Sequence, residues 1–333
     1  MSDPISTASQ FDALLSCVEC GGTSLERESN RFRCGDCGSE YEVIDGVASF
    51  FRKESAVTGP DNDRMEFWNQ GWNDTSSPFA TVERDDPAEL REAFHSMLTA
   101  QRYPAVTWLS EENVRDRVLL NVGCGGGYEG VLFAGYGARY IGVDFSINAA
   151  RSTRRLIESA KYTGTCYQCE AERLPLQDST IDIIYTNGVL HHTPNTPDTL
   201  RELHRVLRPG ARAIIALYAT RSAAFYWYRI RAVLAGNFTK RSVERWVDRR
   251  TEGEWQTDGR ENQHTRSYTR AEFRTLIENA GFKVTRIEQS QLQLGDIPVL
   301  GRIFRPLLPS KALRKCIAPF GMMLIAECRP DDK

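Results

Sequence analysis

The sequence predicts an α/β fold in which a mostly parallel sheet follows a small cysteine-rich module. Two observations support this prediction. Residues 118–122 (VLLNV) form a short apolar run, typical of a strand buried on both faces, and a glycine cluster and a helical stretch follow it. Residues 17–38 hold four cysteines in two C-x-x-C pairs, with thirteen residues between the pairs.

Composition and charge favour a globular protein and give no sign of a nucleic-acid-binding or membrane-spanning one. A chain of 333 residues can form one large domain with an appendage, and 41% hydrophobic with 26% charged residues is typical of a globular protein. The net charge of -2 provides no overall attraction to nucleic acid. The first residues lack the pattern of a signal peptide, and no stretch approaches the roughly 20 apolar residues of a membrane span. We expect a cytoplasmic protein whose nine cysteines are reduced.

The first segment, residues 1–55, is predicted to form a zinc-ribbon module. Cys17, Cys20, Cys34 and Cys37 have the spacing at which two tight turns each present two thiolates to a tetrahedral ion. Residues 31–34 and 40–51 alternate as strands do. Four thiolates leave no open position for water or substrate, so we expect the zinc to be structural. Catalysis must then lie elsewhere in the chain.

The second segment, residues 56–110, is predicted to hold a linker and N-terminal helices. A polar stretch from about residue 52 to residue 60 precedes Phe67, Trp68 and Trp72. Aromatic side chains so spaced either pack the segment against its neighbour or form a lid over a ligand, and the sequence leaves both open. Between residues 86 and 109, apolar residues recur at helical spacing.

The third segment begins with one β-α-β unit. The strand at residues 118–122, the glycine cluster and a helix lead to a second strand at 140–143, which ends at Asp144. Gly125, Gly127 and Gly130 satisfy the pattern G-x-G-x-x-G, and Asp144 lies where dinucleotide-binding folds place an acid for the ribose. This single match is compatible with two adenosine-bearing ligands, a nicotinamide dinucleotide and S-adenosylmethionine.

The following residues favour the second ligand. Glu170 and Glu172 follow a third predicted strand, a strand at 181–186 ends in NGVLHH, and RVLRPG precedes another strand. These motifs resemble the small-molecule branch of class I S-adenosylmethionine-dependent methyltransferases, over about residues 65–328 and most strongly over 118–218. The resemblance implies a Rossmann-like, seven-stranded sheet with an antiparallel C-terminal hairpin. It would occupy residues 111–333, with an insertion at about 221–267.

The resemblance also implies a set of cofactor-binding residues. A glycine loop would approach the cofactor, Asp144 would hold both ribose hydroxyls, and Glu170 and Ala171 would contact adenine. The full set is Asn121, Gly123, Gly125, Gly127, Asp144, Phe145, Glu170, Ala171 and Asn187. Asn121 departs from the family, which usually has a carboxylate here near the methionine ammonium, so a charge interaction is lost. A dinucleotide-dependent oxidoreductase, the less favoured alternative, would not need Glu170 or the NGVLHH motif.

Two adjacent histidines are the candidate catalytic residues. His191 and His192 lie where a base could remove a proton from an oxygen or nitrogen acceptor. Their alternative role is to pack or cap the helix that follows. Cys166 and Cys169 form a third C-x-x-C, which we interpret as a pair of buried or edge thiols and not as a second metal site.

The methyl acceptor is expected beneath an insertion after the fifth strand. Residues 221–274 are rich in aromatic residues and carry 12 Lys/Arg against 7 Asp/Glu. Phe225–Tyr228 suggest a helix that covers the site, although a basic face in contact with water is as compatible with the charges. We favour a small or lipid-like metabolite. The alternative is RNA, because the N-terminal module resembles the zinc-ribbon subunit that activates certain tRNA methyltransferases, and the module could equally dock a protein partner.

Overall fold

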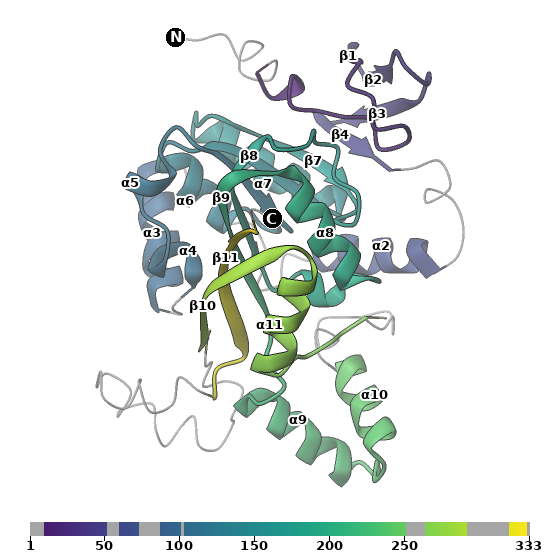
Figure 1. The fold of residues 1–333 in the computed structure, drawn as a ribbon, viewed down its shortest axis with the longest axis vertical. Helices are drawn as coiled ribbons and strands as arrows, with labels where there is room; N and C mark the ends of the chain where they lie inside the picture. Colours follow the sequence, from purple (N-terminus) through teal and green to yellow (C-terminus); the bar gives the residue numbers. More distant parts are fainter. Residues whose placement is uncertain are drawn as a thin grey trace.

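The computed structural model describes residues 10–51, 60–72, 87–100, 103–250, 264–291 and 320–331 (Figure 1). The strands are β1 (Leu25–Arg27), β2 (Arg31–Cys34), β3 (Glu40–Ile44), β4 (Val47–Phe50), β5 (Val118–Val122), β6 (Arg139–Asp144), β7 (Gly164–Cys169), β8 (Ile181–Asn187), β9 (Leu207–Tyr218), β10 (Phe282–Ser290) and β11 (Met323–Pro330). The helices are α2 (Pro60–Gly71), α3 (Pro87–Ala100), α4 (Pro104–Thr107), α5 (Glu111–Val114), α6 (Tyr128–Gly135), α7 (Ile147–Ser159), α8 (Thr196–Val206), α9 (Ala223–Leu234), α10 (Lys240–Arg250) and α11 (Arg270–Asn279), with a 3₁₀ turn, η1 (Leu190–His192). The predicted linker falls mostly on residues 52–59, which lie outside the described residues, as do residues 251–263 of the predicted insertion.

The central sheet has the predicted arrangement. Seven strands lie in the order β7-β6-β5-β8-β9-β11-β10. The first five pair in parallel, and β11 pairs antiparallel to both β9 and β10. The seven-stranded Rossmann-like sheet with an antiparallel C-terminal hairpin is therefore confirmed. Because β6 and β8 flank β5 on opposite sides, a crevice opens at the carboxyl ends of these strands, where ligands bind in such sheets.

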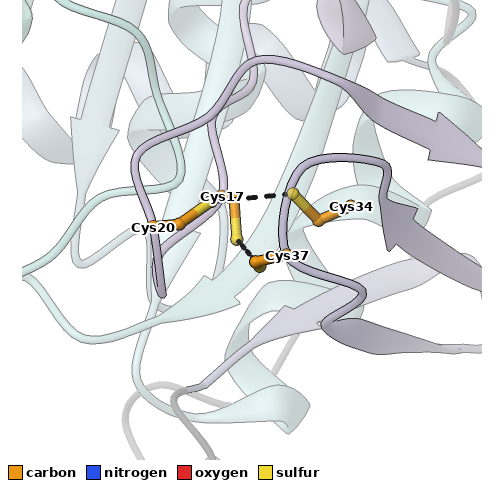
Figure 2. Close-up of side chains that lie close together, drawn as sticks. All are labelled: Cys17, Cys20, Cys34 and Cys37. Carbon is orange, nitrogen blue, oxygen red and sulfur yellow. Dashed lines mark hydrogen bonds between the residues drawn. The ribbon is translucent and has the colours of Figure 1, made fainter.

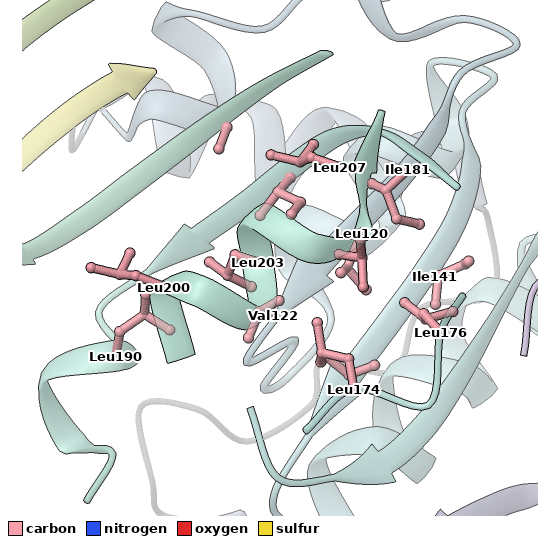
Figure 3. Packing of buried hydrophobic residues seen from close by; sticks show 14 of the residues in the cluster. Leu120, Val122, Ile141, Leu174, Leu176, Ile181, Leu190, Leu200, Leu203 and Leu207 are labelled. Carbon is pink, nitrogen blue, oxygen red and sulfur yellow. The ribbon is translucent and has the colours of Figure 1, made fainter. Parts of the chain in front are cut away.

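Hydrophobic layers cover both faces of the sheet. Neighbouring residues of β5 face opposite layers, so Leu119 packs in the layer with α6 and α7, and Leu120 packs in the layer with α8. Figure 3 shows Leu200 and Leu203 of α8 in the same packing cluster as Leu120 and the adjoining strand residues. All five residues of β5 are buried, as expected of a central parallel strand. The two layers fix the strand ends from which the candidate site is built.

The N-terminal module continues the main sheet. Strands β1 to β4 form an antiparallel series, and β4 pairs in parallel with β7, placing Ala48 opposite Tyr167. The ring of Phe50 lies 4.9 Å from that of Tyr41 and 5.6 Å from that of Tyr167, measured between centroids. The module is thus attached to the α/β core through backbone pairing as well as side-chain packing. A module held against the catalytic domain was expected from the sequence, but the backbone pairing of β4 with β7 was not.

Candidate functional site

One cavity of about 530 Å³ lies at the carboxyl ends of the central strands. Its walls come from the loops after β5, β6, β7 and β8 and from helices that pack above them. The volume falls in the range of about 300–1,000 Å³ that is usual for small-molecule and cofactor sites. Of the predicted cofactor-binding residues, Asn121, Gly127 and Glu170 do not line it. The six that do are Gly123, Gly125, Asp144, Phe145, Ala171 and Asn187.

The glycine loop after β5 needs residues without a side chain. Gly123 and Gly125 line the cavity and have φ angles of 73° and 52°, in the left-handed region that favours glycine. A Cβ atom at Gly123 would lie 2.2 Å from the Val189 side chain, and one at Gly125 would lie 2.6 Å from the Trp72 ring. Gly127, with φ 83°, begins α6 at its N-cap. Glycine at positions 123 and 125 therefore lets the loop pack closely against Val189 and Trp72.

Asp144 connects the end of β6 to this loop. Its Oδ2 accepts a hydrogen bond from the Gly125 backbone N–H at 2.9 Å, and its Oδ1 accepts one from the Ser146 backbone N–H at 2.9 Å. Burial raises the pKa of Asp144 to about 6, and the backbone hydrogen bonds oppose that rise. Each carboxylate oxygen still has capacity for a second hydrogen bond, so the pair can accept two hydroxyl groups.

Helix α2 covers one side of the cavity. Arg64, Trp68 and Trp72 line the cavity, whereas Phe67 is buried in the interior. The sequence left two roles open for these aromatic residues, a lid over a ligand or packing. Trp68 and Trp72 therefore lie where a lid would lie, whereas Phe67 packs in the interior. Asn69 anchors the helix: its Oδ1 accepts a hydrogen bond from Ser146 Oγ at 2.7 Å.

Of the two residues predicted to contact adenine, only Ala171 lines the cavity. Glu170 lies outside the cavity wall, beside helix α2, with its Oε1 3.5 Å from Arg64 Nη2. The Arg64 guanidinium also lies 4.2 Å from the centroid of the Phe145 ring. Glu172, which was not among the predicted residues, lines the cavity in its place.

The predicted residue Asn121 lies outside the cavity wall, and Glu129, which was not predicted, lies in it. Asn121 is 1% exposed, donates from Nδ2 to Tyr140 Oη at 3.2 Å, and does not line the cavity. Glu129, in the first turn of α6, does line it and accepts a hydrogen bond from Tyr185 Oη at 3.3 Å. Burial raises the pKa of the Glu129 carboxyl above its usual value. The sequence signal for Glu129 was an acid inside the glycine motif, between Gly127 and Gly130, where the N-terminus of the following helix stabilises negative charge.

The two histidines have different environments. His191 is fully buried, its ring centroid lies 3.7 Å from that of Tyr218, and neither ring nitrogen has a hydrogen-bond partner among the described residues. His192 lines the cavity, and its Nδ1 lies 3.0 Å from the carbonyl oxygen of His264. Burial lowers the pKa of His192 to about 4 and that of His191 well below the usual value. His192 is therefore neutral at pH 7, with its proton on Nδ1 and the lone pair on Nε2.

The remaining wall of the cavity is aromatic and thioether-rich. Tyr103, Tyr218 and Tyr228 line it together with Met322 and Met323. Within the predicted covering helix, α9, Phe225 is buried and Tyr228 reaches the cavity, whereas Tyr226 is 46% exposed. Only one face of this helix therefore belongs to the site.

The four N-terminal cysteines converge from two loops (Figure 2). Their Sγ atoms all lie within 4.8 Å of one another, with Cys17 3.6 Å from Cys37 and Cys20 3.7 Å from Cys34. Tetrahedral zinc with Zn–S bonds of about 2.3 Å requires S···S separations of about 3.8 Å, which these distances match. Hydrogen bonds from Ser39 lower the pKa of Cys37 to about 6, whereas burial raises the pKa of Cys34 above its usual value. In the ranges that the structure describes, no other group of three or more such ligands comes together.

Two further sequence expectations concern other parts of the chain. Cys166 and Cys169 are buried in β7, apart from the four-cysteine cluster, in agreement with their interpretation as buried thiols. Within the described helices, none has the length and hydrophobicity required to cross a bilayer.

Comparisons with known proteins agree with this geometry. Residues 120–215 match a family described as a methyltransferase domain. An uncharacterised methyltransferase of Mycobacteroides abscessus is 35% identical over 132 residues, which are 38% of this chain and 50% of that protein. Tocopherol O-methyltransferase of Arabidopsis thaliana is 25% identical over 185 residues, 53% of this chain and 50% of that protein. An S-adenosylmethionine-dependent methyltransferase structure from Mesorhizobium loti aligns with 69% of this chain and 97% of its own, at 18% identity and a TM-score of 0.47.

The chain spans about half the length of the two sequence relatives. The family match covers the stretch from β5 to β9, which holds the glycine loop, Asp144 and both histidines. Residues 120–215 of this chain therefore match a methyltransferase domain.

Proposed function

We propose that this protein transfers a methyl group from S-adenosylmethionine to a small or lipid-like acceptor. The observation that carries the proposal is the junction of the glycine loop with Asp144 at the wall of a single cavity. S-adenosylmethionine supplies a methyl group already activated on a sulphonium, so the protein has mainly to align the acceptor and exclude water. The aromatic lid of α2 and the wall from α9 are placed for both tasks.

The residues proposed to face the cofactor divide into three groups, and Glu170 acts indirectly. Asp144 accepts from the ribose hydroxyls, and Phe145 with Ala171 borders the adenine. Gly123 and Gly125 allow the loop backbone to approach the methionine portion. Glu170 acts indirectly, by fixing Arg64 of the lid.

Glu129 provides the negative charge that Asn121 lacks. Its carboxylate lies in the cavity wall, next to the glycine loop and hydrogen-bonded to Tyr185. A half-buried carboxylate in this position pairs with the α-ammonium of the methionine portion, and such a charge-assisted pair strengthens in a dry site. The charge usually placed at the end of the first strand is thus supplied from the first turn of the following helix.

His192 is the candidate base for an acceptor that must lose a proton. The hydrogen bond to the His264 carbonyl oxygen orients the ring and leaves Nε2 as the proton-accepting atom. His191 supports it by packing between His192 and Tyr218. We assign His191 a structural role.

The cavity lining favours a metabolite over RNA. Among the described lining residues, Arg64 is the only Lys or Arg, whereas Glu129, Asp144 and Glu172 are acidic. An RNA site would need a wide basic surface and base-stacking platforms open to water. Relatives of this chain include proteins named as tocopherol and sterol methyltransferases, which supports an apolar acceptor.

We further propose that the four cysteines hold one structural zinc ion. Bound zinc would stabilise a module too small to fold securely by its own core. The module reaches the cofactor site through Phe51, whose ring lies 5.5 Å from that of Phe145. It therefore shapes the adenine side of the cavity.

The proposal is tested by following the methyl group. Purified protein is incubated with tritium-labelled S-adenosylmethionine and a cell extract, and the products are divided into organic-soluble, aqueous small-molecule, RNA and protein fractions. Label in a small-molecule fraction, reduced in the His192→Ala variant, is the expected result. Label confined to RNA would establish the alternative function, and no transfer to any fraction would contradict methyl transfer.

A further inference from the structure

The hairpin formed by α9 and α10 carries a stripe of exposed apolar side chains. Tyr226, Ile230 and Val233 lie on one side of α9 and are 46%, 51% and 44% exposed. Leu234 at the end of this helix is 79% exposed, and Phe238 in the loop before α10 is 81% exposed. Single exposed apolar residues are common on protein surfaces, but five in thirteen consecutive positions on one element form a patch that usually has a partner.

The opposite side of α9 is already occupied by the protein. Ala224, Phe225 and Ala232 are buried, and Tyr228 lines the cavity. Helix α9 is thus apolar on both sides, and no described residue covers the outer side. Figure 1 shows the hairpin projecting from one end of the molecule, beyond the sheet, so the outer side can meet a large flat surface.

The positive charge of the α9–α10 hairpin indicates what kind of surface it would bind. Residues 221–250 contain eight Lys/Arg and two Asp/Glu, in a chain whose overall charge is -2. Lys240 and Arg241 are exposed and follow Phe238 closely, and Arg245 is exposed one turn later. Basic residues beside exposed aliphatic and aromatic side chains characterise elements that lie in the interface of an anionic bilayer.

We propose that the α9–α10 hairpin docks the protein on an anionic lipid surface. Leu234 and Phe238 at the tip enter the boundary between headgroups and acyl chains, and Lys240 with Arg241 contact the lipid phosphates. The helix that touches the lipid on its outer side presents Tyr228 to the cavity on its inner side. If the proposed function holds, a lipid-like acceptor reaches the cavity directly from the bilayer; docking itself does not depend on that function.

The test measures vesicle binding without any methyl donor. The full chain is sedimented with vesicles of 70% phosphatidylcholine and 30% phosphatidylglycerol, and with vesicles of pure phosphatidylcholine. We expect binding to the first kind, at least tenfold weaker binding to the second, and a loss of binding in high salt. The Leu234→Ser/Phe238→Ser variant should bind at least tenfold more weakly than the parent protein.

Two matched controls separate docking from general surface properties. Ile44→Ser removes an exposed apolar residue of β3 and should leave vesicle binding unchanged. Lys240→Glu/Arg241→Glu should abolish the preference for anionic vesicles, whereas Arg115→Glu/Lys161→Glu, at exposed positions elsewhere, should retain it. Thermal unfolding shows whether the Leu234→Ser/Phe238→Ser variant is folded. If it is not, Lys240→Glu/Arg241→Glu with its control tests the proposal in its place.

Three outcomes would overturn the proposal. The first is that the parent protein sediments with neither kind of vesicle, and the second is that the tip variants bind as the parent does. The third is that the parent protein is a dimer in solution that Leu234→Ser/Phe238→Ser converts to a monomer, in which case a second copy covers this surface. In each case the methyl-transfer proposal would stand, because cofactor binding is measured separately.

Discussion

Gly125 and Asp144, nineteen residues apart, are joined by a hydrogen bond of 2.9 Å from the glycine N–H to the buried carboxylate. The bond joins the loop after β5 to the end of β6 and holds both at the cavity wall. Asp144 thereby positions the loop, and its carboxylate oxygens can still accept hydrogen bonds from a ligand. The first two predictions follow from this arrangement.

Asp144→Ala should weaken S-adenosylmethionine binding by about 1.5–3 kcal/mol, because two hydrogen bonds to a charged acceptor are lost. Isothermal calorimetry measures the change, and circular dichroism confirms that the variant is folded. Unchanged affinity in a folded variant would remove Asp144 from the site.

Cofactor affinity should also fall as the pH is lowered from 7.5 to 5.5. Burial raises the pKa of Asp144 to about 6, so the carboxylate is ionised at the upper limit and largely protonated at the lower one. A protonated carboxyl accepts hydroxyl hydrogen bonds less well, and we expect about fourfold weaker binding at pH 5.5. The Asp144→Asn variant should show a much flatter pH dependence. An equally steep dependence in that variant would assign the effect to another group.

Glu129→Gln should weaken binding of S-adenosylmethionine by about tenfold, because the partner of its ammonium group loses its charge. The same variant should bind 5′-methylthioadenosine, which lacks the amino and carboxyl groups of methionine, as the parent protein does. Glu172→Gln, which removes another carboxylate of the cavity wall, is the matched control. Equal losses for both ligands would indicate that Glu129 only supports the fold.

His192→Ala should lower kcat with little change in cofactor affinity, because His192 acts on the acceptor. A loss of about 10²–10⁴-fold is the range expected for a general base. His191→Asn should instead lower the melting temperature, since His191 is buried against Tyr218. A normal kcat for His192→Ala with an acceptor that must lose a proton would contradict the assignment.

Parts of this site could be predicted from the sequence because they lie at the ends of apolar runs. The loop glycines and Asp144 directly follow strands whose buried character is visible in their composition. Glu129 could not be identified in this way, because its place in the cavity wall depends on a hydrogen bond from Tyr185 of β8, 56 residues later. Adjacent His191 and His192 could not be distinguished either, because the turn of η1 alone decides which ring faces the cavity. The pairing of β4 with β7 involves backbone groups, which leave no pattern in the sequence.

Cys34→Ser should reduce the zinc content from one ion per chain and lower the melting temperature, because metal binding contributes to folding of the module. Affinity for S-adenosylmethionine should fall by about tenfold at most, the usual worth of one aromatic contact, through the loss of order at Phe51. Phe51→Ala should reproduce the affinity change while retaining zinc. Metal analysis that finds no zinc in the parent protein would contradict the zinc site.

The central claim is tested most directly by calorimetric titration of the purified parent protein with S-adenosylmethionine and, separately, with NADH. The account predicts one site per chain for S-adenosylmethionine, weakened in Asp144→Ala, and no comparable binding of NADH. Tighter binding of NADH than of S-adenosylmethionine would contradict it.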